Sequence, residues 1–84
     1  MTALSEIKAR YLALQQEADF ALWRAREANI EIRNGYQRHL AGECGPPPLE
    51  QLEAIRQLEQ HAEARYRELR AFLREHFDRL AIPA

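Results

Sequence analysis

The sequence has a single cysteine and no long apolar run, so it lacks the features of disulfide-stabilised and membrane-inserted proteins. Among its 84 residues there is one cysteine, Cys44, so an intramolecular disulfide is excluded. A lone cysteine is typical of a reducing compartment, and we expect the cytoplasm. The first residues lack the basic-then-apolar pattern of a signal peptide. No apolar run approaches the roughly 20 residues that cross a bilayer, so we expect no membrane partner.

Groups that perform catalysis or bind metals are also scarce. The chain has one serine, Ser5, and the only chemical partner beside Cys44 in the sequence is Glu43, an acidic residue that does not activate a thiol. The three histidines, His39, His61 and His76, show no His-x3-His spacing, and a folded hairpin would hold them apart. Because a zinc site needs three or four convergent ligands, we predict no metal site and no cofactor. We also predict that the protein is not an enzyme.

Charge of one sign is not in excess, since 12 basic and 13 acidic side chains give a formal net charge of −1. Proteins whose main partner is a nucleic acid usually carry a basic excess, so the composition argues against that class. Four arginines nevertheless fall along one flank of the second predicted helix and form a candidate phosphate-contacting flank: Arg56, Arg67, Arg70 and Arg74. The alternative function is therefore a small dimeric bundle of four helices that binds RNA or another nucleic acid.

The sequence does contain two long segments with heptad periodicity, separated by Gly45-Pro46-Pro47-Pro48. Apolar residues recur in steps of three and four, which predicts one buried face of an α-helix, as in coiled coils. They are Leu4, Ile7, Tyr11, Leu14, Ala18, Ala21, Ala25, Ala28 and Ile32 in the first segment, and Leu52, Ile55, Ala62, Tyr66, Leu69, Leu73, Phe77 and Leu80 in the second. Consecutive prolines cannot continue a helix. We predict an all-α, antiparallel two-helix hairpin that forms one domain over 1–84, with helices over about 3–41 and 48–80 and a loop over 42–48.

The ends and one interior point of these helices can be predicted from single residues. Thr2 or Ser5 is expected to cap the first helix, and Gly42 to end it in the left-handed conformation. Asn34-Gly35 is a turn-like pair, so a break there is the alternative to the continuous helix that we favour. A glycine at this point of the buried face would admit a bulky neighbour from the second helix.

The first helix has two apolar faces, which one partner helix cannot cover together. Its small residues favour close approach of the second helix, giving an intrachain seam of Ala18, Ala21, Ala25, Ala28, Tyr66 and Leu69. On the opposite side lies a predicted oligomer or partner face of Leu12, Phe20, Trp23 and Ile30. In the alternative arrangement, Trp23 packs inside the hairpin and the alanines meet a second chain.

These patterns favour a protein whose role is to bind other proteins. We expect a homodimer that forms a four-helix bundle, because the chain has more apolar surface than one hairpin can bury. The predicted function is a non-enzymatic interaction module that acts as a small adaptor, cochaperone or regulatory protein. An amphipathic helix of another protein is the second expected partner.

Overall fold

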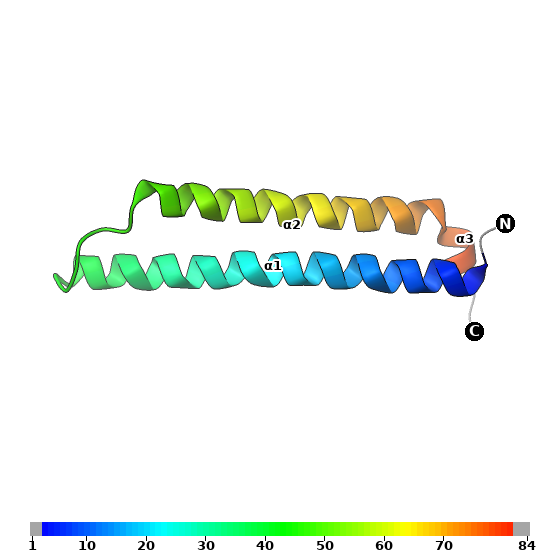
Figure 1. Cartoon of the computed structure of the whole chain (residues 1–84), viewed down its shortest axis with the longest axis horizontal. Coiled ribbons are helices and arrows are strands. Elements are labelled where there is room, and N and C mark those ends of the chain that lie inside the picture. Colours follow the sequence, from blue (N-terminus) through cyan, green and yellow to red (C-terminus); the bar gives the residue numbers. More distant parts are fainter. Residues whose placement is uncertain (1–2, 82–84) are drawn as a thin grey trace.

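The computed structural model describes residues 3–81, which form a helical hairpin with no strand (Figure 1). The helices are α1 (Leu4–Leu40), α2 (Leu49–Glu75) and the short α3 (Phe77–Leu80). α1 and α2 lie side by side and antiparallel, and the described chain measures 61 × 21 × 15 Å. The predicted all-α hairpin is thereby confirmed. None of the described helices is both long enough and apolar enough to cross a bilayer.

The core follows the heptads but is thin. Nine apolar residues are buried, and four of the nine are alanines: Ile7, Leu14, Ala18, Ala21, Ala25, Ile32, Ile55, Ala62 and Leu69. Leu14, Ala18 and Leu69 form its central cluster, against which Tyr11, Tyr66, Phe72 and Leu73 pack. The cluster is covered only from two sides, so among the described residues no side chain larger than alanine is less than 2% exposed.

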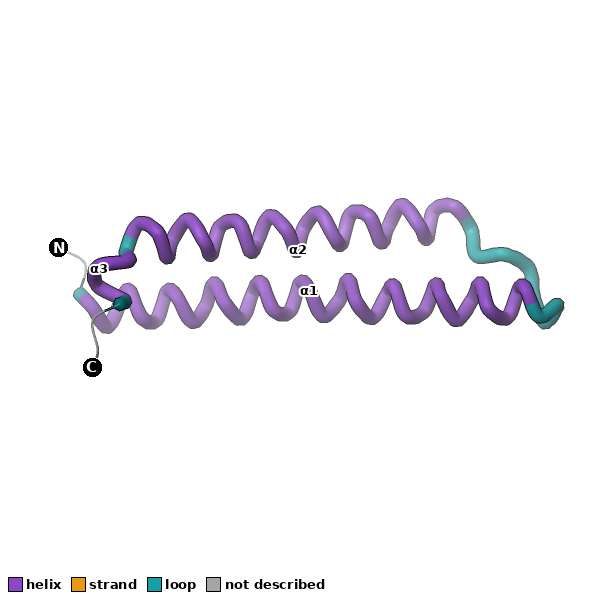
Figure 2. Tube along the Cα trace, turned by 180° about the vertical axis from the view of Figure 1, so that it is seen from behind, coloured by secondary structure: helices purple, strands orange, loops and turns teal. Residues whose placement is uncertain are grey.

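The turn forms as its glycine and prolines predict. Gly42 has a φ of 81°, the left-handed conformation that an L side chain avoids. Its amide donates to the His39 carbonyl at 3.0 Å, and the Glu43 amide donates to the Arg38 carbonyl at 2.9 Å. This pair of bonds is the Schellman motif, which satisfies the last carbonyls of α1. The chain then runs extended to Pro48, and α2 begins at Leu49 (Figure 2).

α1 is continuous through Asn34-Gly35, as favoured, but Gly35 contacts a different neighbour from the one predicted. A Cβ atom built at Gly35 would lie 3.0 Å from Cγ of Pro47. The small residue therefore admits a loop proline rather than a side chain of α2. The proline segment therefore lies against α1 just before α2 begins.

The predicted helix starts and the predicted end of the second helix need correction. Ala3 caps α1 with no side-chain hydrogen bond, and Ser5 lies inside the helix. Thr2, the other expected cap, lies outside the described residues. The second helix does not run to Leu80, because His76 has φ −110° and ψ 22° and interrupts it after Glu75.

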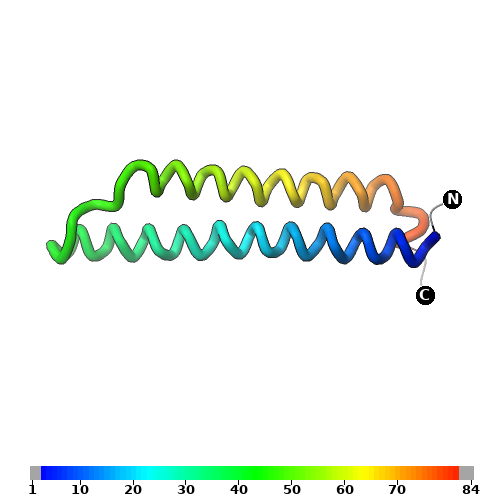
Figure 3. The backbone as a smooth tube through the Cα atoms, viewed as in Figure 1, coloured from blue at the N-terminus to red at the C-terminus, as the bar shows by residue number. Residues whose placement is uncertain are grey.

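The interruption turns α3 toward the beginning of α1, as the orange end of the tube shows in Figure 3. The His76 carbonyl accepts hydrogen bonds from the amides of Arg79 and Leu80 at 3.1 and 3.0 Å, which starts the new helix. Leu80 is half-buried there, whereas Phe77 is 65% exposed. Phe77 therefore lies outside the buried face to which the heptads assigned it.

Candidate interaction surface

Four large apolar side chains form an exposed strip along α1, here called the outer face. They are Leu12, Phe20, Trp23 and Ile30, with exposed fractions of 53%, 59%, 56% and 45%. Each lies two positions from a buried residue of α1: Leu14, Ala18, Ala21 or Ala25, and Ile32 respectively. Two positions correspond to about 200° around an α-helix, so the outer face points away from α2.

The aromatic rings at the middle of the outer face are ordered against each other. Phe20 and Trp23 are three residues apart, which places them on neighbouring turns of one face. Their ring centroids lie 5.9 Å apart with an angle of 23° between the planes, a stacked arrangement. The pair presents a broad apolar area to solvent.

The intrachain seam lies on the other side of α1. Ala18, Ala21 and Ala25 are buried, and Ala28 is half-buried. From α2, Leu69 is buried in the same cluster as Ala18. In the hairpin, therefore, these alanines face α2, while Trp23 lies outside the core.

Tyr66 links α2 to α1 at the edge of the intrachain seam through a polar contact that the sequence pattern did not indicate. Its hydroxyl donates to Oδ1 of Asp19 at 2.5 Å, joining α2 to α1 across 47 positions of sequence. This hydrogen bond raises the pKa of Tyr66 above its usual value, because loss of the phenolic proton would place a second negative charge beside the carboxylate. In the sequence, the one indication of this contact was Asp19, an acidic residue within the otherwise apolar segment 18–23.

A groove runs along the hairpin on the Tyr66 side. Its volume is about 370 Å³, and its lining is Leu22, Ala25, Glu59, Ala62, Glu63, Tyr66 and Arg70. On the other side, a hollow of about 260 Å³ is lined by Glu17, Phe20, Ala21, Arg24, His61 and Arg65. Phe20 therefore lies at the edge of this hollow as well as on the outer face.

The candidate phosphate-contacting flank is exposed but interrupted by acidic groups. Arg56, Arg67, Arg70 and Arg74 are all exposed on α2. Nη2 of Arg67 donates to Oε1 of Glu63 at 3.0 Å, and Arg70 lines the groove that also contains Glu59 and Glu63. The flank therefore does not form a continuous positive strip.

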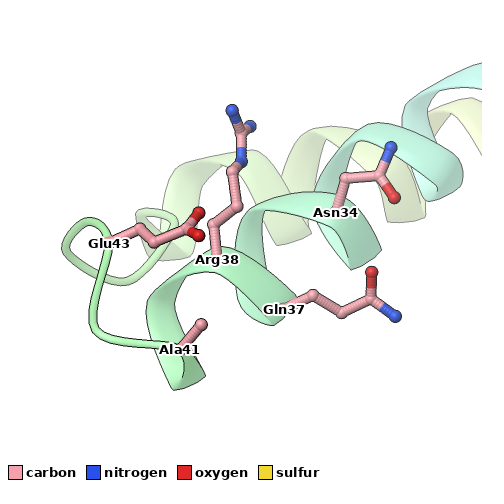
Figure 4. Close-up of a pocket in the computed structure, with 5 residues that line it drawn as sticks. All are labelled: Asn34, Gln37, Arg38, Ala41 and Glu43. Carbon is pink, nitrogen blue, oxygen red and sulfur yellow. The ribbon is translucent and has the colours of Figure 1, made fainter.

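A hollow at the loop end of α1 has the wrong form for a catalytic site (Figure 4). It has a volume of about 510 Å³ and is lined by Asn34, Gln37, Arg38, Ala41 and Glu43. All five residues are exposed, and in Figure 4 the side chains of Asn34, Gln37 and Arg38 point in different directions. Catalysis needs groups that converge on one position.

The histidines are dispersed along the hairpin. Nδ1 of His39 lies 3.0 Å from the Cys44 carbonyl oxygen. The His76 ring packs against Phe72, with centroids 4.5 Å apart, and His61 lines the hollow beside Phe20. Within residues 3–81, no three His, Cys, Asp or Glu side chains are placed to hold a metal ion together.

No protein-family model, curated protein or solved structure matches the chain. The function must therefore be inferred from its surfaces. Among these, the outer face of α1 has the composition and the exposure of a contact surface.

Proposed function

We propose that the protein is a non-enzymatic protein–protein interaction module that associates with a second copy of itself through the outer face. In this role it serves as a small adaptor, cochaperone or regulatory protein. The proposal is carried by the exposure of Leu12, Phe20, Trp23 and Ile30 on the side of α1 that α2 does not cover. A homodimer would contain four long helices, two from each copy.

The thin core supports self-association. Four of the nine buried residues are alanines, so the hairpin removes little apolar surface from water. Small domains of this kind commonly gain the missing burial by oligomerising. Covering the outer face would add four large side chains from each copy to the buried set.

The expected strength of association follows from the same residues. Full burial of a large apolar side chain contributes about 1.5–3 kcal/mol, and these side chains are already about half-buried. Eight of them, four from each copy, would therefore contribute about 6–12 kcal/mol. Association itself costs about 4–15 kcal/mol in lost translational and rotational freedom. The largest net gain within these ranges is about 8 kcal/mol, which corresponds to a Kd near micromolar, so the dimer is expected to be weak and reversible.

The location and the second expected partner belong to the same proposal. We place the protein in the cytoplasm because its cysteine, Cys44, is exposed and unpaired. The amphipathic helix of another protein is the other occupant that this apolar strip would accept. The arginine flank on α2 supports no second function, because Glu63 already pairs with Arg67.

Sedimentation of the purified protein tests the proposal with two matched variants. Trp23→Glu places a charge at the middle of the outer face, whereas Leu49→Glu places one at an equally exposed leucine outside that face. We expect the wild type and Leu49→Glu to sediment as dimers. Trp23→Glu should sediment as a monomer with an unchanged helical dichroism spectrum.

Two results would contradict the proposal. One is a wild type that stays monomeric at near-millimolar concentration and captures no protein from its own cytoplasm after nuclease treatment. The other is a Leu49→Glu variant that dissociates as fully as Trp23→Glu, because the outer face would then have no special role.

A further inference from the structure

We propose that the two copies meet with their α1 helices antiparallel, related by a twofold axis that passes between the two α1 helices, level with residues 21 and 22. The two α1 helices then form the middle of a flat layer of four helices, and the two α2 helices form its outer edges. The proposal rests on the proposed function, because it specifies how the outer face is used.

The layer follows from where the outer face lies. Trp23 stands between the buried residues Ala21 and Ala25, about 200° from each around the helix. A second copy that covers Trp23 therefore approaches α1 from the side opposite α2. In a closed four-helix bundle, the second copy would instead pack beside the grooves between α1 and α2. That arrangement would leave the middle of the outer face in water.

The antiparallel orientation follows from the order of residues along the outer face. With the axis between 21 and 22, Phe20 lies opposite Trp23 of the second copy, and Leu12 lies within one residue of the level of Ile30. Between these apolar pairs, Gln16 lies opposite Glu27, and both are exposed in the hairpin. The Gln16 amide can donate a hydrogen bond to the Glu27 carboxylate. Twofold symmetry repeats each contact, so apolar side chains meet apolar ones and polar side chains meet polar ones.

A parallel arrangement in register lacks this complementarity. Every residue then faces its own counterpart, so Glu27 would meet Glu27 in the middle of the contact. Like charges that face each other across two packed helices disfavour that partner orientation. The two helix dipoles would also point the same way, whereas antiparallel helices place opposite ends together.

The charged residues beside the outer face add a small preference for the same orientation. In an antiparallel pair of helices each flank meets the same flank of the other copy. The axis at 21/22 places three pairs of opposite charge, and two pairs of like charge, within one turn of each other. The opposite pairs are Asp19 with Arg26, Glu17 with Arg24 and Glu6 with Arg38, and the like pairs are Lys8 with Arg33 and Glu17 with Glu27. Within the hairpin, Asp19 also accepts the Tyr66 hydroxyl, and Oε2 of Glu17 lies 3.8 Å from Nη1 of Arg65.

These flank pairs act on orientation more than on strength. All of these side chains are exposed, and exposed ion pairs contribute little to affinity. Their effect is to disfavour the competing arrangement, because like charges that face each other oppose it. The antiparallel dimer should therefore loosen, but keep its orientation, when the salt concentration rises.

The area available is sufficient for a specific dimer. α1 has 37 residues, so its length is about 55 Å at about 1.5 Å per residue. A contact strip about 10–12 Å wide along it covers about 600 Å² on each copy. The two copies together would bury about 1,200 Å², which is the lower end of the range for stable, specific interfaces.

Disulfide cross-linking tests the orientation directly. Cys44→Ala removes the native thiol, and Gln16→Cys or Glu27→Cys is then introduced singly, giving two proteins that are mixed in equal amounts and oxidised. In the antiparallel dimer, residue 16 faces residue 27, so the mixed 16–27 disulfide should dominate. Residues 16 of the two copies would be separated by about 16 Å along the helix axis, beyond the ~7 Å Cα separation that a disulfide spans.

The native cysteine gives an independent distance, because Cys44 is exposed at the loop end. A spin label on Cys44 should show a separation of about 60 Å between copies, since each loop extends beyond the opposite end of its partner's α1. Dominant 16–16 and 27–27 disulfides, or labels close together, would overturn the antiparallel orientation. If the orientation is overturned in this way but Trp23→Glu still sediments as a monomer, the proposed function stands. A monomeric wild type would overturn both.

Discussion

Replacing Ala18 by leucine should destabilise the hairpin strongly, because no space is available at this position. Ala18 is 0% exposed and lies in the central cluster between Leu14 and Leu69. A leucine side chain adds three carbon atoms, which must push the two helices apart or force neighbouring side chains out of their preferred rotamers. Overpacking of this kind costs about 1–3 kcal/mol. For a chain of this length the melting temperature should fall by about 5–20 °C.

Leucine substitutions at two other alanines show how the loss of stability depends on the space around each side chain. Ala21 is buried but borders the hollow beside Phe20, so a leucine there can extend partly into free space and should cost less. Ala64 is exposed on α2, and leucine there should change the stability by less than about 0.5 kcal/mol. The expected order of destabilisation is therefore Ala18→Leu, then Ala21→Leu, then Ala64→Leu.

The measurement is thermal unfolding followed by circular dichroism at 222 nm, a wavelength chosen because it reports helix. All four proteins must be compared at one protein concentration, because association shifts the melting temperature by mass action. An Ala18→Leu protein that melts with the wild type would refute the packing described here. The same conclusion would follow if Ala64→Leu were the most destabilised of the three.

Three further substitutions test the turn and the polar contact. Gly35→Ala should stabilise the helix by less than the ~1 kcal/mol usual for this exchange, because the new Cβ meets Pro47. In a Pro47→Ala background the full gain should return. Equal gains in both backgrounds would contradict the contact. Gly42→Ala should cost about 1–2 kcal/mol in chemical denaturation, because φ is 81°, and a neutral result would argue against the Schellman turn. Tyr66→Phe should lower the melting temperature. Because the pKa of Tyr66 is raised from 10.0 by its bond to Asp19, this contribution is complete below pH 10 and is lost as the pH rises through the higher folded-state value. A wild type and a Tyr66→Phe variant that melt in parallel from neutral to strongly alkaline pH would contradict that linkage.

The helices and the turn were predictable because each depends on local sequence. Steps of three and four between apolar residues fix which side of a helix is buried. Three consecutive prolines exclude a helix at that point, and Gly42 marks the end of α1 because a glycine adopts a positive φ at no steric cost. The four exposed residues of the outer face were predictable for the same reason, since they lie two positions from members of the buried stripe.

The contacts between the helices depended instead on tertiary structure. The Tyr66 hydroxyl reaches Asp19, and Pro47 lies against Gly35, only because the length and course of the loop set the register of α2 along α1. Periodicity gives the face of each helix but not its position along the other. The interruption at His76 was missed for a related reason. The local pattern continues to Leu80, while the chain turns at His76 so that α3 packs at the beginning of α1. By itself, then, the sequence determined two helices, their buried stripes and the turn, because these follow from backbone geometry within a few residues. The register, the polar contact across the seam and the final turn were decided by packing between segments that are distant in the chain.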